Sequence, residues 1–153
     1  MLVSALVAFV HFAAAFGLAA ALVYERAVFT RHPTATDVRH LAAADRWYGI
    51  ASVVLLGAGL ARAFLYEKGW AFYAANPFFH LKLTLFVAVG LLSIYPTLMF
   101  IRWNKAAKRG QAPVVTEMQH QRIRLVMNLE LAALVGIVLS ASLMAHGVMQ
   151  SVR

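Results

Sequence analysis

Four long apolar runs limit this chain to one broad kind of fold. They cover residues 2–24, 47–65, 80–101 and 125–147. Each has about the 20 mainly apolar residues that a helix needs to cross a bilayer. We therefore predict an all-α integral membrane protein in which residues 1–153 form a single domain, a bundle of four transmembrane helices.

The overall composition agrees with this fold class. Hydrophobic residues make up 62% of the chain and charged residues 13%, and the mean hydropathy is +0.72, too apolar for a soluble domain. The absence of cysteine excludes disulfides, thiolate metal sites and thiol nucleophiles. The first apolar run lacks a basic leading segment and is too long for a signal peptide, so we expect it to stay in the mature protein.

The basic residues predict the orientation of the helices. Four Lys and Arg residues fall within 26–46, six within 102–124, and one within 66–79. The positive-inside rule then puts the two long loops in the cytoplasm and both termini on the outer face. The net charge of +8 is explained by this topology and by anionic lipid head groups, so we predict a lipid bilayer and no nucleic acid as partner.

The third run opens with two ionisable residues, His80 and Lys82. At about 100° per residue, they lie on different faces of the helix. The face of Lys82 also carries Phe86, Val89, Ser93 and Pro96, whereas that of His80 carries Thr84, Val87, Leu91 and Leu98. We expect the Lys82 face to look into the bundle, where Lys82 is either a functional group or an anchor that reaches the interface. Ser93 and Thr97 are placed to bind the carbonyl that Pro96 frees.

His11 is near the middle of the first run, among many alanines and glycines that allow another helix or a flat cofactor to approach closely. Two interpretations stay open. The imidazole is either an axial ligand of haem iron or a neutral ring bonded to a Ser or a carbonyl of another helix. Glu25 follows fourteen residues later and shares roughly the same face.

The second run has polar or small residues at intervals of seven, namely Asp45, Ser52 and Gly59, a pattern typical of a close helix contact. We expect Asp45 at the loop end of this span, paired with an arginine. Before it, residues 34–44 are predicted to form a short interfacial helix. Near the other end, Arg62 either binds an anionic group such as a cofactor carboxylate or pairs with Glu67.

The fourth run carries Glu130 about one turn inside the span, where we expect it to be paired with arginine or protonated. His146 shares its face with Asn128, Val135 and Ser142 instead. The loop residues His32 and His40 are expected to be solvated. Asn76 is predicted to cap the helix that follows it.

The chain resembles a family of small four-span bacterial membrane proteins known only as a domain of unknown function. The matching features are His11, Glu25, the 57–62 segment, Lys68-Gly69, the segment from Asn76 to Lys82, and Ser93 with Pro96-Thr97. More distantly, it is similar to HemJ, the four-span haem-containing protoporphyrinogen oxidase. That similarity rests on a midspan His, a His-x-Lys-Leu opening of the third span, and an Asn and a Glu near the start of the fourth.

The HemJ resemblance implies haem b bound among the first three spans, with His11 as axial ligand and Lys82 in the site, as second ligand or as a cation beside the haem. His80 and Arg62 are further cofactor-binding candidates. The chain departs from HemJ at Asn128-Leu129-Glu130 and at Pro96-Thr97, which bears on the substrate more than on haem. Counted from the span starts, His11 lies about 14 Å below the outer boundary and Lys82 only about 3 Å, a gap that tilt or an earlier helix start must close.

The first functional hypothesis is an inner-membrane haem b protein with an electron-transfer or oxidoreductase role, passing electrons to a quinone or a porphyrin-like small molecule. The second is a non-catalytic membrane subunit or scaffold without cofactor. The third is a small transporter in which Glu25, Glu130 and His11 form a proton relay. The small-residue stripe of the second run serves contacts within one bundle or between two copies of a homo-oligomer.

Overall fold

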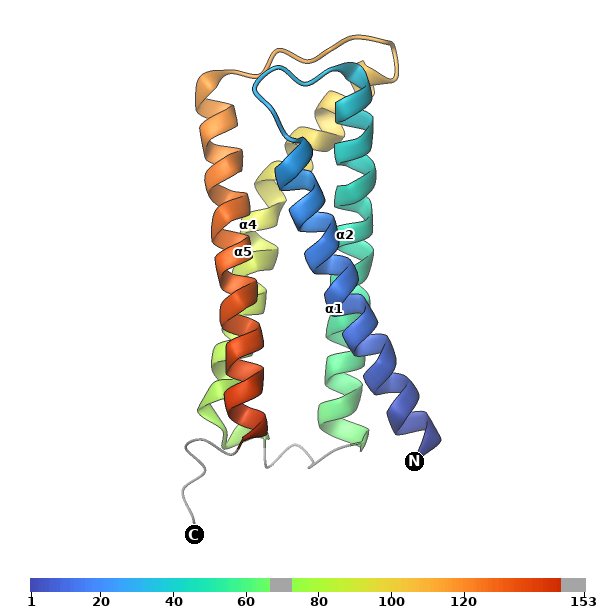
Figure 1. Ribbon diagram of the computed structural model, residues 1–153, viewed down its shortest axis with the longest axis vertical. Coiled ribbons are helices and arrows are strands. Elements are labelled where there is room, and N and C mark those ends of the chain that lie inside the picture. The colour runs from blue at the N-terminus through green and yellow to red at the C-terminus, as the bar shows by residue number, and fades with distance from the viewer. Residues whose placement is uncertain (67–72, 147–153) are drawn as a thin grey trace.

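The computed structural model describes residues 1–66 and 73–146, and this part of the chain is helical with short connections. The elements, in chain order, are α1 (Leu2–Val28), α2 (Ala35–Ala61), the π-helical turn η1 (Arg62–Tyr66), α4 (Pro77–Ala107) and α5 (Glu117–Ala145) (Figure 1). Counting α2 with η1 as one, four helices in the described residues are long and apolar enough to cross a membrane. The prediction of an all-α four-helix membrane fold is confirmed.

The helices form a ring in the order α1, α2, α4, α5. Each helix contacts its two neighbours in this ring, and within the described ranges α1 makes no close backbone approach to α4, nor α2 to α5. Loops 29–34 and 108–116 lie at one end of the bundle, called here the loop end. The start of α1 and the end of α5 lie at the other, called here the terminus end (Figure 1). The membrane side that each end faces stays a prediction.

Side-chain caps define where three helices begin. Thr34 and Asp37 form a capping box at the start of α2, and Thr116 forms another with Gln119 at the start of α5. Asn76 accepts a hydrogen bond from the Phe78 N–H at the start of α4, so the predicted cap is confirmed.

The prediction of a separate interfacial helix over residues 34–44 is wrong. The capping box starts one helix at Ala35, and this helix runs unbroken to Ala61 because no proline interrupts it. The other helices also extend past the predicted spans at the loop end. The predicted end of the fourth span, Gly147, lies outside the described residues.

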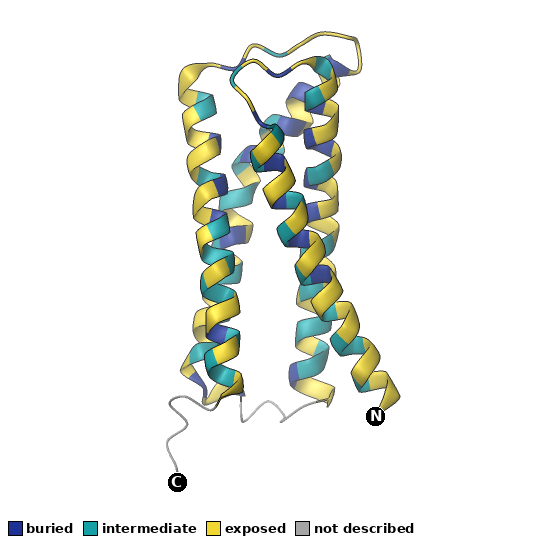
Figure 2. Ribbon diagram, viewed as in Figure 1, coloured by how far each residue is buried: buried dark blue, intermediate teal, exposed yellow. Residues whose placement is uncertain are grey.

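The apolar core is concentrated towards the loop end (Figure 2). Its centre is aromatic: the Phe29 ring stacks on Trp103 and meets the edge of Phe100, with ring centroids 6.2 Å and 5.9 Å away. Because Phe29 follows the last residue of α1, these contacts tie the end of α1 to α4. The core of the terminus end is smaller and consists of Ala63, Tyr73 and Phe79.

The predicted faces of α4 are confirmed by burial. On the Lys82 stripe, Val89 and Pro96 are buried and the other members are half-buried, whereas every residue named on the His80 face is exposed. The role predicted for the two hydroxyls beside Pro96 is wrong. Ser93 donates to the Gly90 carbonyl and Thr97 donates to Asp45. A hydroxyl has one hydrogen to donate, and both are used elsewhere.

Candidate functional site

His11 lies where α1 crosses α2. Its Nδ1 is 3.1 Å from the Leu55 carbonyl oxygen, and since a carbonyl only accepts, Nδ1–H is the donor. Gly59, the last residue of the predicted small-residue stripe of α2, lies against the same ring. A Cβ added there would lie 3.1 Å from His11 Cε1 and 3.3 Å from Nδ1, closer than ordinary contact. The close helix contact predicted from the stripe of α2 is therefore present, and the imidazole occupies it.

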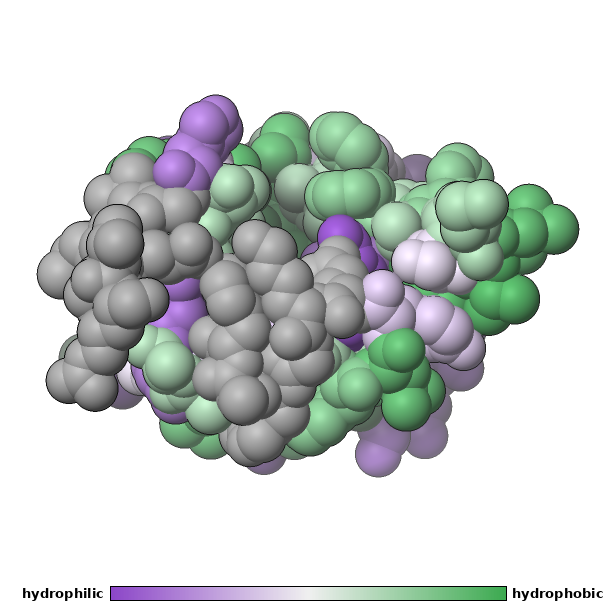
Figure 3. Space-filling model, turned by 90° about the horizontal axis from the view of Figure 1, so that it is seen from below, coloured by the Kyte–Doolittle hydropathy of each residue, from purple (hydrophilic) through white to green (hydrophobic). Residues whose placement is uncertain are grey.

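Arg62 stands beside this contact, at the first position of η1. Its guanidinium carbon is 5.1 Å from the centroid of the Phe12 ring, within the range of a cation–π interaction, and Phe12 is the neighbour of His11 on α1. Short π-helical turns are rare and frequently occur at functional sites. Seen from the terminus end, hydrophilic side chains lie in separate spots among hydrophobic ones (Figure 3). Glu67, the predicted alternative partner of Arg62, is outside the described residues.

Lys82 is half-buried on α4, with its Nζ 5.4 Å from the centroid of the Phe79 ring. Since α4 is diagonal to α1, Lys82 and His11 belong to opposite sides of the bundle. Their depths are closer than the sequence indicated. α4 begins at Pro77, so Lys82 is about 7 Å along the helix from the start of α4. Gly59, which lies opposite His11, is about 10 Å from the end of η1. These two helix ends lie at similar heights in Figure 1, and the earlier helix start closes most of the gap.

His80 is on the exposed face of α4, away from the bundle interior. Its Nε2–H donates to the Ala74 carbonyl at 2.8 Å, a bond that joins the start of α4 to the segment before it. Of the four predicted cofactor residues, His11 and Arg62 therefore lie together and Lys82 faces the bundle from the opposite helix, whereas His80 faces outwards.

A second group of polar residues lies deeper, towards the loop end. It comprises three carboxyl residues from three helices: Glu25, Asp45 and Glu130, which are 3%, 9% and 2% exposed. All three are buried in the same half of the bundle and are near enough to influence one another electrostatically. Thr97 of α4 donates a 2.6 Å hydrogen bond to Asp45 Oδ1. One oxygen each of Glu25 and Glu130 has no hydrogen-bond partner among the described residues.

The expected pairing of Asp45 with an arginine is wrong, and so is its position at the loop end. Because α2 starts at Ala35, Asp45 is ten residues inside the helix. No arginine in the described ranges forms an ion pair with any of the three carboxyl groups, and Arg26 instead donates to the Asn128 side chain at 2.8 Å. Arginine pairing is therefore also excluded for Glu130 within these ranges.

Sequence reasoning missed Tyr48 as a member of this group. It is 5% exposed, its hydroxyl has no hydrogen-bond partner among the described residues, and all three carboxyl groups act on it electrostatically. A signal was available: Tyr48 is one turn after Asp45 and one turn before Ser52, so it lies on the polar stripe of α2. Among described residues no three His, Asp or Glu side chains are placed to hold a metal ion.

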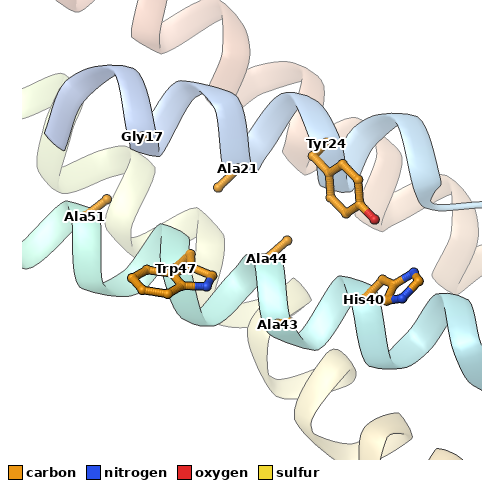
Figure 4. Close-up of a pocket in the computed structure, with 8 residues that line it drawn as sticks. All are labelled: Gly17, Ala21, Tyr24, His40, Ala43, Ala44, Trp47 and Ala51. Atoms are coloured by element: carbon orange, nitrogen blue, oxygen red, sulfur yellow. The ribbon is translucent and has the colours of Figure 1, made fainter. Parts of the chain in front are cut away.

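A shallow groove of about 480 Å³ lies on the outer side of α1 and α2 (Figure 4). Its walls are mainly small residues, including Gly17, Ala21 and Ala51, with Trp47 along the groove and Tyr24 and His40 towards one end. Because its lining is mainly small and apolar, the groove suits a lipid chain or another helix. His32 and His40 are both exposed.

The fold and these buried polar residues define the protein as a small integral membrane four-helix bundle with ionisable groups in its interior. Residues 3–149 match the family described as "Predicted membrane protein (DUF2214)". Since the match covers nearly the whole chain, the protein belongs to this family, and the predicted membership in a family of unknown function is confirmed. No curated protein and no solved structure matches, and the similarity to HemJ stays a prediction.

Proposed function

We propose that this protein is a haem b membrane protein with an electron-transfer or oxidoreductase role, located in the bacterial inner membrane. His11 is the axial ligand, Lys82 is the second ligand or a cation beside the haem, and Arg62 binds a haem propionate. The proposal rests on the setting of His11, a half-buried histidine whose Nδ1–H is bonded to a backbone carbonyl.

That hydrogen bond favours metal binding through the other ring nitrogen. A histidine that binds a metal almost always donates its second ring N–H to a carbonyl or carboxylate, which fixes the tautomer and the ring orientation. When His11 Nδ1–H donates to Leu55, the lone pair of the neutral ring is on Nε2. Gly59 supports the same reading, because a side chain there would displace the imidazole.

The remaining residues fit the group chemically. Imidazole is a common axial ligand of haem iron, and a guanidinium binds carboxylates such as propionates. When bound, haem b supplies one-electron redox chemistry, with a quinone or a porphyrin-like molecule as the proposed partner. The protein residues would hold and orient the group, and Lys82 would add positive charge beside it. His80 is left out of the site because it is exposed and bonded to Ala74.

The proposal is tested by visible absorption spectra of the detergent-purified protein, oxidised and then reduced with dithionite. We expect a Soret band and a reduced b-type spectrum in the wild type. The spectrum should be lost in His11→Ala and weakened in Lys82→Ala. His80→Ala is the matched control, since it removes a histidine at the same end of the bundle but on the outer face, and it should leave the spectrum unchanged.

A wild-type protein that stays colourless after incubation with haem would refute the proposal. The same contact of His11 would then be read as a helix-packing hydrogen bond in a scaffold without cofactor. For the transporter hypothesis, the buried side of α1 does not connect Glu25 to His11 by polar side chains. Glu25 is about 21 Å from His11 along α1, and the buried residues between them, Ala14, Leu18 and Leu22, are apolar.

A further inference from the structure

The carboxyl residues of the loop-end half form a site that haem binding does not use. Glu25 comes from α1, Asp45 from α2 and Glu130 from α5, and α4 adds the Thr97 hydroxyl. All four helices of the ring thus contribute a buried or half-buried polar group to the same region of the interior. An ionised carboxylate costs several kcal/mol to bury without a cation, and ionisable residues in a membrane helix mark functional sites by default.

Within residues 1–66 and 73–146, the groups that face this region carry no compensating positive charge. They are Glu25 of α1, Asp45 and Tyr48 of α2, the Ser93 and Thr97 hydroxyls of α4, and Glu130 of α5. Arg26 is next to Glu25 in the chain, but its guanidinium bonds Asn128, which is on the exposed side of α5. Three carboxyl groups in such surroundings cannot all be ionised together, because like charges at close range in a low-dielectric interior repel strongly.

Tyr48 is an independent indication that this region binds something. Its hydroxyl is buried and makes no hydrogen bond of good geometry within the described ranges, although the Ser93 hydroxyl and all three carboxyl groups are near enough to act on it. A phenol can donate a hydrogen bond to a carboxylate or accept one from a carboxylic acid, so it can stabilise either protonation state. Since most buried polar groups in native proteins are hydrogen-bonded, an unsatisfied one calls for an explanation such as a bound proton, water or ion.

We propose that Glu25, Asp45 and Glu130, with the Tyr48 hydroxyl, form a proton-binding site in the bundle interior. Each step joins one proton to a carboxylate oxygen, giving a neutral carboxylic acid, and the reverse step returns it to water. The loop end is the nearer source, since α1 ends at Val28, three residues after Glu25. The site is separate from the proposed haem ligands, because Glu25 and His11 are about 21 Å apart along α1.

The test is an infrared difference titration of the full chain in liposomes, which records the C=O stretch of protonated carboxyl groups as pH changes. We expect titrating bands in the wild type, and Glu25→Gln, Asp45→Asn and Glu130→Gln should each remove one component. Glu117→Gln is the matched control. Glu117 is exposed and paired with Arg31, so its loss should leave these buried-carboxyl bands in place. Tyr48→Phe should shift the bands without removing any.

Two outcomes would overturn the proposal. One is the absence of a titrating carboxyl band in the wild type, or a band that survives all three substitutions. The other is a band that moves when Na⁺ is added at constant pH, which would identify a metal-cation site instead. If a variant fails to fold, isotope-labelled glutamate in the wild type must shift the bands. The titration is repeated in His11→Ala, where the bands should persist. Failure of the haem proposal can then be distinguished from failure of the proton-site proposal.

Discussion

The two halves of the bundle accommodate polar groups in different ways. At the terminus end, His11 and His80 each donate to a backbone carbonyl, and Arg62 and Lys82 lie over aromatic rings. These groups are half-buried or exposed. In the loop-end half, three carboxyl residues and Tyr48 are buried in the interior, and several of their polar atoms have no hydrogen-bond partner in the described residues.

This difference in burial and bonding is the basis for proposing a different role for each half of the bundle. A half-buried histidine with one ring nitrogen bonded to a carbonyl has a fixed orientation, as metal-binding histidines do. Buried carboxyl groups without cations are poised to exchange protons, since the neutral form removes the cost of burial. Under the two proposals, the terminus-end half holds a redox cofactor and the loop-end half binds protons. Four substitutions test this comparison.

The largest effect is expected in the core of the loop end. Phe100→Ala removes a fully buried ring that contacts Phe29 and Trp103. Because the surrounding helices cannot fill the cavity, we expect the free energy of unfolding to fall by about 3 kcal/mol. Detergent-titrated unfolding followed by circular dichroism measures this. Leu98→Ala, on the exposed face of the same helix, is the control, and an equal loss there would contradict the assigned faces.

A smaller loss is expected where Thr97 holds Asp45. Thr97→Val keeps the shape of the side chain but removes the donor of the 2.6 Å hydrogen bond. The free energy of unfolding should fall by about 1–2 kcal/mol, because the carboxyl group stays buried with one partner fewer. Thr84→Val provides the comparison, since Thr84 is exposed on α4. If the two variants are equally stable, the Asp45 bond contributes nothing.

At the terminus end, Gly59→Ala should act through His11. The added Cβ would lie 3.1 Å from the imidazole, so the ring must move and its bond to Leu55 must lengthen. We expect a loss of about 1 kcal/mol from overpacking, together with a changed haem spectrum. Gly57→Ala is matched to it, because a Cβ at Gly57 meets nothing within 4 Å. An unchanged spectrum in Gly59→Ala would show that the glycine does not position His11.

The smallest effect is expected for the ion pair between Arg31 and Glu117. Both side chains are exposed to solvent, at 40% and 53%. Exposed pairs contribute little, so Arg31→Ala should lower the free energy of unfolding by less than about 1 kcal/mol. The difference should shrink further at high salt. A loss as large as that of Phe100→Ala would mean that this pair, and not the aromatic contacts of Phe29, holds the first loop.

Much of the fold followed from patterns within single helices. The period of 3.6 residues separated the Lys82 face of α4 from the His80 face, and burial agrees. Asn76 was identified as a cap from its place before Pro77. Errors arose where a prediction needed the position of one helix against another. Asp45 was assigned an arginine partner because it was thought to lie at a loop end, although the helix begins ten residues earlier.

The candidate sites show the same limit. His11 was identified as a functional candidate from its midspan position, but its bond to Leu55 and its contact with Gly59 depend on how α1 crosses α2. Tyr48 was overlooked because a tyrosine in an apolar run looks like an ordinary core or interface residue. Only its burial beside the carboxyl groups distinguishes it.

The sequence by itself determined the membrane class, the four helices and the inward face of α4, because hydropathy and periodicity are properties of one segment in a bilayer. The tertiary structure alone decided that α1 lies diagonal to α4 and that Glu25, Asp45 and Glu130 converge. Ring order and relative depth depend on which small residues allow two helices to approach. These approaches join segments that are far apart in the chain, so they cannot be predicted from the pattern within one segment.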